Sequence, residues 1–185
     1  MDLREAESML KLIAQGDRKA LARAISIVEN NLLGSKDLLS KLKTNSSIPV
    51  IGITGPPGAG KSTLINAMIT ELSARDKKIA IVAVDPTSPF NYGSLLGDRL
   101  RMSEHFTDPN IFIRSIATRG SLGGLSEKII EIVDVLRAAD FDLILVETVG
   151  VGQSEVEIAG LADTTVVVVV PESGDEIQTL KSGIM

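Results

Sequence analysis

The residues best suited to do chemistry form one short run, Gly55-Pro56-Pro57-Gly58-Ala59-Gly60-Lys61-Ser62. It matches the pattern G-x-x-x-x-G-K-[ST] at every required position. The glycines let the backbone curl closely around an anion, so that N–H groups and the positive end of the next helix face phosphate oxygens. We expect Lys61 to reach the β- and γ-phosphates, Ser62 to ligate Mg²⁺ and Thr63 to support the α-phosphate. The alternative is a glycine-rich turn without function, which the agreement of motif and context disfavours.

Carboxylates near the metal are the second requirement of such a site. Asp85 directly follows the apolar run 78–84, and Glu147 follows the apolar run 142–146. Ligands bind at the carboxyl ends of strands in open α/β sheets, so we expect both side chains at the site as catalytic and Mg²⁺-binding groups. Asp85 could instead cap a turn. Asp98 is a further candidate for the metal shell, although a charge at a helix end explains it nearly as well.

The run Glu147-Thr148-Val149-Gly150 resembles the D-x-x-G switch of GTPases, with Glu in place of Asp. The Gly150 N–H would then contact the γ-phosphate, and loss of that phosphate would release the loop. The alternative is an acidic strand end followed by a turn. Val151 stands where Ras-like enzymes carry the water-orienting Gln, and Gln153 comes two residues later, so we expect slow intrinsic hydrolysis assisted by another segment or partner. The only histidine, His105, is predicted to be a surface or half-buried residue rather than a site residue.

The elements that must position these residues follow a regular alternation. Five runs rich in Val and Ile are predicted strands, at 48–53, 78–84, 110–114, 142–146 and 164–170. Helical stretches are predicted between them, at 61–74, 94–106 and 125–139. Alternation of this kind indicates βαβ units, and hence an α/β fold of three αβα layers around a mainly parallel sheet, as in P-loop NTPases.

The first 47 residues have a different, helical pattern. Apolar residues recur at helical spacing, Gly16 is predicted to end the first helix and Asp17 to cap the second. Ser35 is predicted to cap a short third helix at 36–43. We therefore expect an N-terminal helical appendage at 1–47 and a nucleotide-binding domain at 48–185 that is incomplete at its C-terminus.

Composition excludes several classes of protein. The chain has 185 residues, of which 44% are hydrophobic and 23% charged, which is typical of a globular domain. It has no cysteine, which excludes disulfides and thiolate metal sites. The net charge of −5 argues against nucleic-acid binding. The longest apolar run, 166–170, is far shorter than the roughly 20 residues of a membrane span, so we expect no membrane span and a cytoplasmic protein.

Five segments occur in an order that resembles one family. They are the phosphate loop, Asp85-Pro86-Thr87-Ser88, Leu96-Gly97-Asp98-Arg99, Arg119-Gly120-Ser121-Leu122-Gly123-Gly124 and Glu147-Thr148-Val149-Gly150-Val151-Gly152-Gln153-Ser154-Glu155. From about Asp17 to the last residue the chain resembles the MeaB/ArgK-type P-loop GTPases, which are chaperones of adenosylcobalamin-dependent methylmalonyl-CoA mutase. Some members carry an older label as lysine/arginine/ornithine transport-system ATPases or kinases.

The resemblance implies a bound GTP or GDP with Mg²⁺, and GTP hydrolysis coupled to loading or protection of the cofactor of the mutase. It also implies a homodimer of the full-length form. A mobile, nucleotide-sensing segment is implied at 171–181, where Asp175, Glu176, Gln178 and Lys181 match the family pattern. The resemblance implies that Lys181 is a catalytic residue that activates hydrolysis. Glu172-Ser173 and Tyr92 depart from the family pattern, so the switching could differ in detail.

Family members continue into further strands, an N-K-x-D motif that selects guanine, and a C-terminal dimerisation arm. This chain has no such motif, so we expect it to be truncated, and these residues alone do not distinguish GTP from ATP. An ATP-dependent kinase or ATPase of an amino-acid transport system is therefore the main alternative function. A nickel-type metallochaperone is a further alternative, but this chain lacks the cluster of soft metal ligands that such a protein would need. A folded fragment that binds nucleotide poorly is the last alternative.

Overall fold

The computed structural model describes residues 3–85, 102–117, 128–148 and 154–171. Its centre is a five-stranded sheet in the order β3-β2-β4-β1-β5, in which every pair of neighbours is parallel. The strands are β1 (Val50–Thr54), β2 (Ile79–Asp85), β3 (Ile111–Ala117), β4 (Leu143–Glu147) and β5 (Thr164–Val167). The strand that leads into the phosphate loop, β1, therefore lies between β4 and β5. The predicted α/β class with a parallel sheet is confirmed.

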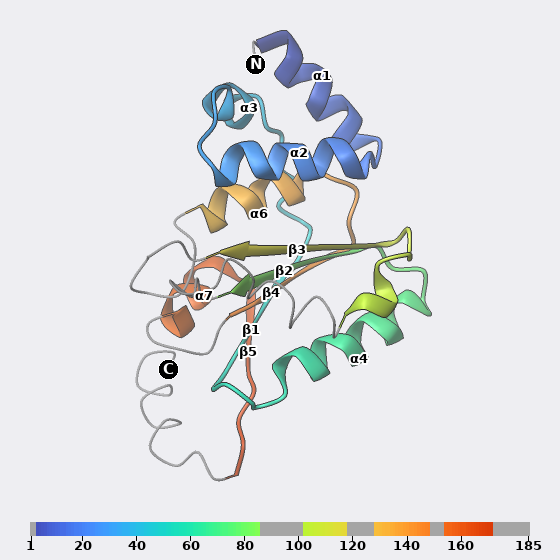
Figure 1. Cartoon of the computed structure of the whole chain (residues 1–185), viewed down its shortest axis with the longest axis vertical. Coiled ribbons are helices and arrows are strands. Elements are labelled where there is room, and N and C mark those ends of the chain that lie inside the picture. Colours follow the sequence, from blue (N-terminus) through green and yellow to red (C-terminus); the bar gives the residue numbers. More distant parts are fainter. Residues whose placement is uncertain (1–2, 86–101, 118–127, 149–153, 172–185) are drawn as a thin grey trace.

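Helices cover both faces of this sheet (Figure 1). Strand β2 is apolar at consecutive positions because its two faces are both buried. Ile79 and Ile81 pack with α4 (Lys61–Ser73), whereas Ala80 and Val82 belong to the cluster on the opposite face. That opposite face is covered by α6 (Ile129–Arg137) and α7 (Ser154–Leu161).

Helix α7 lies very close to the phosphate-loop strand because β1 carries a glycine at its centre. A Cβ on Gly52 would lie 2.4 Å from Cγ1 of Ile158, which is far inside van der Waals contact. Any larger side chain at this position would push α7 away from the sheet. The sequence pattern did not predict α7, since its apolar residues are not gathered on one face.

Three N-terminal helices add a further layer over α6: α1 (Leu3–Ala14), α2 (Arg18–Glu29) and α3 (Ser35–Ser40) (Figure 1). The predicted cap of α2 is confirmed, because the Asp17 carboxylate accepts hydrogen bonds from the N–H groups of Lys19 and Ala20. Residues of α1, α2 and α3 share one apolar core with the sheet face under α6. The division of the chain at residue 47 stays a prediction.

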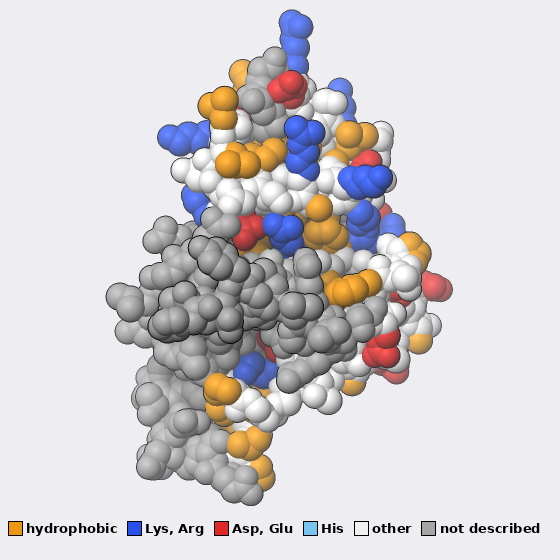
Figure 2. All heavy atoms as spheres, viewed as in Figure 1, with side chains coloured by type: hydrophobic (Ala, Val, Ile, Leu, Met, Phe, Trp, Pro, Cys, Tyr) orange, Lys and Arg blue, Asp and Glu red, His pale blue; other side chains and the backbone are white. Residues whose placement is uncertain are grey.

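A buried ion pair also joins this helical layer to the sheet. Arg114 on β3 contacts Glu29 at the end of α2 at 2.6 Å, and the Glu29 side chain is 8% exposed. Figure 2 shows that Lys and Arg side chains gather over the N-terminal helices on the face drawn there.

Some predicted boundaries differ from the observed ones. The strand predicted at 164–170 ends at Val167, because its pairing with β1 stops at Thr54, where β1 gives way to the phosphate loop. The N–H of Val168 still donates to the carbonyl of Thr54. The third helix covers 35–40 rather than 36–43, and the residue at its N-cap is Gly34 rather than Ser35. In the described part of the predicted helix 94–106 the structure has a short 3-10 helix, η1 (Ser103–His105). Residues 94–101 lie outside the described residues.

None of the helices in the described part of the chain is long and apolar enough to span a bilayer.

Candidate functional site

The phosphate loop leaves the carboxyl end of β1 and enters α4 directly. Gly55, Gly58 and Gly60 have φ angles of 137°, 76° and 93°, in the region that glycine adopts at little cost. Gly60 is the N-cap of α4 and Lys61 is its first residue. The loop therefore turns sharply and brings the positive N-terminal end of α4 to the edge of the sheet, which is the geometry of an anion site.

The first glycine of the loop is also required for packing. A Cβ on Gly55 would lie 2.0 Å from the carbonyl oxygen of Val168, just after β5. The N–H of Val168 in turn donates to the carbonyl of Thr54 at 2.8 Å. The loop thus begins at a point where two chain segments touch backbone to backbone.

The Lys61 side chain is buried, with an exposed fraction of 7%. Its Nζ donates hydrogen bonds to the carbonyl oxygens of Gly55, at 2.8 Å, and Pro56, at 3.0 Å. The ammonium group is therefore folded back onto the first turn of the loop, where it adds a full positive charge to the N–H groups of α4.

Ser62 and Glu147, both predicted metal ligands, lie together although they are 85 residues apart. The Ser62 hydroxyl donates to Oε1 of Glu147 at 2.8 Å, and both side chains are buried. The pairing of β1 with β4 causes this, since Glu147 lies beside Ile53 at the end from which the loop departs. A hydroxyl and a carboxylate at the mouth of a phosphate loop fit the oxygen ligands of Mg²⁺.

The pair also fits the usual way in which Mg²⁺ is held with a nucleotide. Among the described residues, no three His, Cys, Asp or Glu side chains gather into a metal site. Mg²⁺ does not need such a cage, because it usually takes one or two protein ligands together with phosphate oxygens and water. Ser62 and Glu147 therefore fit a Mg²⁺ ion held beside a phosphate chain, and their role as its ligands stays a prediction.

Some of the remaining predicted site residues lie in the described part of the chain, and others do not. Asp85 ends β2, which neighbours β4, so its backbone lies at the same edge of the sheet as Glu147. Thr63 is exposed in the first turn of α4. Asp98, Gly150 and Lys181 lie outside the described residues. Their roles, and those of the other site residues, stay predictions.

Two residues that the sequence analysis did not single out also border the site. The hydroxyl of Thr148 donates to that of Thr54 at 2.8 Å, and the two residues are 1% and 0% exposed. Thr54 precedes the phosphate loop and Thr148 follows Glu147. The available signal in the sequence was a threonine directly before the phosphate loop and another inside the run Glu147-Thr148-Val149-Gly150.

His105 is half-buried, as predicted. Its Nε2 lies 2.9 Å from Oδ1 of Asn66, and the amide nitrogen of Asn66 donates to Glu104. These contacts join η1 to the outer side of α4, so they account for His105 as a structural residue.

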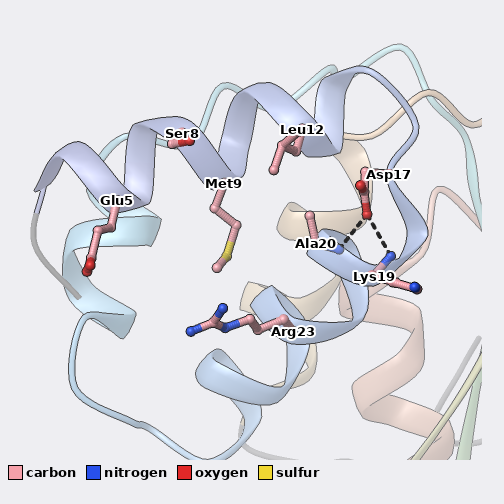
Figure 3. A pocket seen from close by; sticks show the side chains of 8 residues that line it. All are labelled: Glu5, Ser8, Met9, Leu12, Asp17, Lys19, Ala20 and Arg23. Carbon is pink, nitrogen blue, oxygen red and sulfur yellow. Dashed lines mark hydrogen bonds between the residues drawn. The ribbon is translucent and has the colours of Figure 1, made fainter.

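A pocket of about 420 Å³ lies between α1 and α2 (Figure 3). Met9, Leu12 and Ala20 give it apolar walls, and Glu5 and Arg23 stand at its sides. These helices belong to the layer over α6, whereas the phosphate loop leads into α4 on the opposite face. This pocket is therefore separate from the phosphate site.

A protein-family model described as methylmalonyl Co-A mutase-associated GTPase MeaB matches residues 21–185. The chain belongs to the MeaB family. It is 49% identical over 180 residues to a Pyrococcus horikoshii protein named as a GTPase, a match that covers 97% of this chain and 57% of that protein. It is 39% identical over 195 residues to a Caenorhabditis elegans protein named methylmalonic aciduria type A homolog, mitochondrial, with 97% of this chain and 49% of that protein covered. The resemblance found in the sequence is confirmed.

Solved structures agree with this membership. A LAO/AO transport system kinase superposes with a TM-score of 0.71 at 30% identity, over 91% of this chain and 51% of that one. The signal recognition particle receptor FtsY from Elizabethkingia anophelis gives a TM-score of 0.52 at 13% identity, over 99% of this chain and 78% of that one, and shows the fold alone. The MeaB-family chain spans about half the length of the curated relatives named above.

Proposed function

We propose that this MeaB-family chain binds GTP with Mg²⁺ and hydrolyses its β–γ phosphoanhydride bond. The observation that carries the proposal is the hydrogen bond of Ser62 to Glu147 at the N-terminal end of α4, together with the buried Lys61 ammonium on the glycine loop that leaves the sheet there. Guanine, rather than adenine, is supported by relatives that are named GTPases.

The residues of the chain divide the work between binding and charge. The N–H groups of the loop and of the first turn of α4 bind the phosphate oxygens, and Lys61 neutralises part of their charge. Ser62 on α4 and Glu147 on β4 would hold Mg²⁺, which would offset part of the negative charge of the β- and γ-phosphates. A bound triphosphate competes with the carbonyls of Gly55 and Pro56 for the ammonium group of Lys61.

The predicted roles of four residues complete the proposal. Asp85 holds the metal through water or positions the attacking water, and Asp98 adds to the metal shell. Gly150 donates its N–H to the γ-phosphate, and Lys181 activates hydrolysis. The direct experiment is to compare phosphate release in Asp85→Asn and Lys181→Ala variants.

In the whole protein, we propose, hydrolysis assists an adenosylcobalamin-dependent mutase in loading or protecting its cofactor. The support is the description of the matching family model as mutase-associated, together with a relative named for methylmalonic aciduria. A homodimer of the full-length form and a cytoplasmic location belong to the same proposal. Stimulation of GTP hydrolysis by a purified mutase of this type is the expected result.

The basic experiment measures phosphate release from GTP and from ATP, with and without Mg²⁺. We expect Mg²⁺-dependent release from GTP, and a loss of triphosphate affinity of at least about tenfold in Lys61→Ala, because a charged hydrogen bond contributes roughly 1.5–3 kcal/mol. Lys77→Ala is the matched control, since that side chain is 51% exposed in an ion pair with Asp142. An unchanged affinity in Lys61→Ala refutes the assignment of the loop.

A transport-system kinase is the second candidate. The LAO/AO transport system kinase, at 30% identity and a TM-score of 0.71, is the observation that favours it. Labelled γ-phosphate recovered on lysine, arginine, ornithine or a transport protein would support this candidate. Label recovered as free phosphate supports the GTPase.

A further inference from the structure

We propose that the buried hydroxyl pair Thr54–Thr148 is a positioning device that holds the two Mg²⁺-binding side chains at their working distance. The inference rests on the proposed function, because it concerns the metal held by Ser62 and Glu147. Neither threonine contacts the nucleotide in this proposal. Both act through the residues that they adjoin.

The pair lies where the sheet ends and the functional loops begin. The register of β1 and β4 runs as far as Ile53 and Glu147, and the N–H of Thr148 donates to the carbonyl of Ile53 at 3.0 Å. The hydroxyl bond at 2.8 Å between Thr148 and Thr54 lies one residue further along. It ties the two chains together immediately before Gly55 opens the phosphate loop.

Thr54 is also tied on its other side. Its carbonyl accepts the N–H of Val168 at 2.8 Å, just beyond β5. Three neighbouring chain segments therefore meet at this one residue, and Thr54 is restrained on the β4 side by the hydroxyl bond and on the β5 side by the backbone bond.

The distance between the metal-binding groups depends on that tie. Ser62 follows β1 through the phosphate loop, whereas Glu147 belongs to β4, and Oγ and Oε1 lie 2.8 Å apart. Mg²⁺ demands near-ideal octahedral geometry at about 2.0–2.1 Å, so a relative shift of about half an ångström between the strand ends disturbs its coordination.

Two threonines are not needed to fill the space between the ends of β1 and β4. Valine has nearly the volume of threonine, and a pair of valines would avoid the desolvation of two polar groups. When one partner of a buried hydrogen bond is removed, the other is left unsatisfied, whereas removal of both can be nearly neutral for stability. Comparison of the single and double variants, in stability and in Mg²⁺ requirement, therefore distinguishes a positioning role of the pair from a purely structural one.

The experiment uses Thr54→Val, Thr148→Val and the double variant of this chain. Unfolding by urea gives stability, and calorimetric titration with GTP at a series of Mg²⁺ concentrations gives the Mg²⁺ requirement. We expect each single variant to be destabilised and the double variant to recover stability. We expect the Mg²⁺ needed for half-maximal GTP affinity to rise about five- to tenfold in all three, since the tie is absent from each.

Two further variants serve as controls. Thr148→Ser keeps the hydroxyl, and we expect it to stay within about twofold of the wild type in Mg²⁺ requirement. Ser35→Ala removes a buried hydroxyl from α3, and we expect it to leave the Mg²⁺ requirement unchanged. GDP affinity measured without Mg²⁺ is expected to be the same in all variants.

The outcomes are distinguishable. If the Mg²⁺ requirement returns to the wild-type value in the double variant together with its stability, the pair is only structural and the inference is overturned. It is also overturned if Thr148→Ser behaves as Thr148→Val does. If the wild-type chain binds no GTP at any Mg²⁺ concentration, the proposed function fails and the inference falls with it.

Discussion

Replacement of Gly55 by alanine tests the phosphate-loop geometry most directly. The φ angle of Gly55 is 137°, and an added Cβ would lie 2.0 Å from the carbonyl oxygen and 3.0 Å from the carbonyl carbon of Val168. The atom that it meets belongs to the backbone, so a side-chain rotation cannot relieve the clash. Either β1 or the chain after β5 must move.

The expected cost has two parts. A non-glycine residue in this region of φ and ψ costs about 1–3 kcal/mol. To reach ordinary van der Waals contact, which begins at 3.4 Å, the Val168 carbonyl oxygen must withdraw by about 1.4 Å from its 2.0 Å position. This movement breaks the 2.8 Å hydrogen bond from Val168 to Thr54 and costs about a further 1 kcal/mol. We therefore expect a loss of about 2–4 kcal/mol in the free energy of unfolding, or about 4–16 °C in Tm for a chain of this length.

The assay is urea unfolding and a thermal melt, followed by titration with GTP. Two glycines provide controls. Gly58 has a φ of 76° and an added Cβ there meets nothing within 4 Å, so Gly58→Ala should cost only about 1–2 kcal/mol of backbone strain. Gly160 lies in α7 with open space around it, and Gly160→Ala should stabilise the chain by about 0.5–1 kcal/mol.

The reasoning is refuted if Gly55→Ala unfolds at the same urea concentration as Gly58→Ala, since both positions have a positive φ but only a Cβ at Gly55 would meet the Val168 backbone. A variant that folds normally but no longer binds GTP would show instead that the loop, and not its packing on β5, is the sensitive part.

Three further predictions concern stability. The backbone N–H just before β2 donates to the Asp142 carboxylate and holds its pKa below the usual value, so Asp142→Asn should destabilise the chain at pH 7, with the difference lost in urea unfolding as the pH falls below about 4. Glu29→Ala should lower the free energy of unfolding by about 3 kcal/mol because it leaves Arg114 partly buried without its carboxylate, and Glu29→Ala combined with Arg114→Met should recover part of that loss. Ile65→Ala, at a fully buried position of α4, should cost about 2–5 kcal/mol in a thermal melt, whereas Leu64→Ala beside it, at 37% exposure, should cost under about 1 kcal/mol.

Much of the fold could be predicted from local sequence. The five Val- and Ile-rich runs correspond to the five strands, and Asp17 caps α2 as its position before the helical pattern suggested. These features depend on dihedral preferences and short-range hydrogen bonds, which neighbouring residues determine. The boundary error at β5 arose because the end of this strand depends on β1, a partner that is distant in the chain.

The candidate site divides in the same way. The phosphate loop is a contiguous motif, so its residues and its left-handed glycines follow from local sequence alone, and the family could be recognised from the short runs that accompany it. The contact of Ser62 with Glu147 and the hydroxyl pair of Thr54 with Thr148 span 85 and 94 residues. Both contacts depend on β4 lying beside β1, and only the packed sheet decides this strand order. The backbone N–H and C=O groups at the edges of a strand are the same for every sequence, so the residues of a strand do not specify which strand will pair with it.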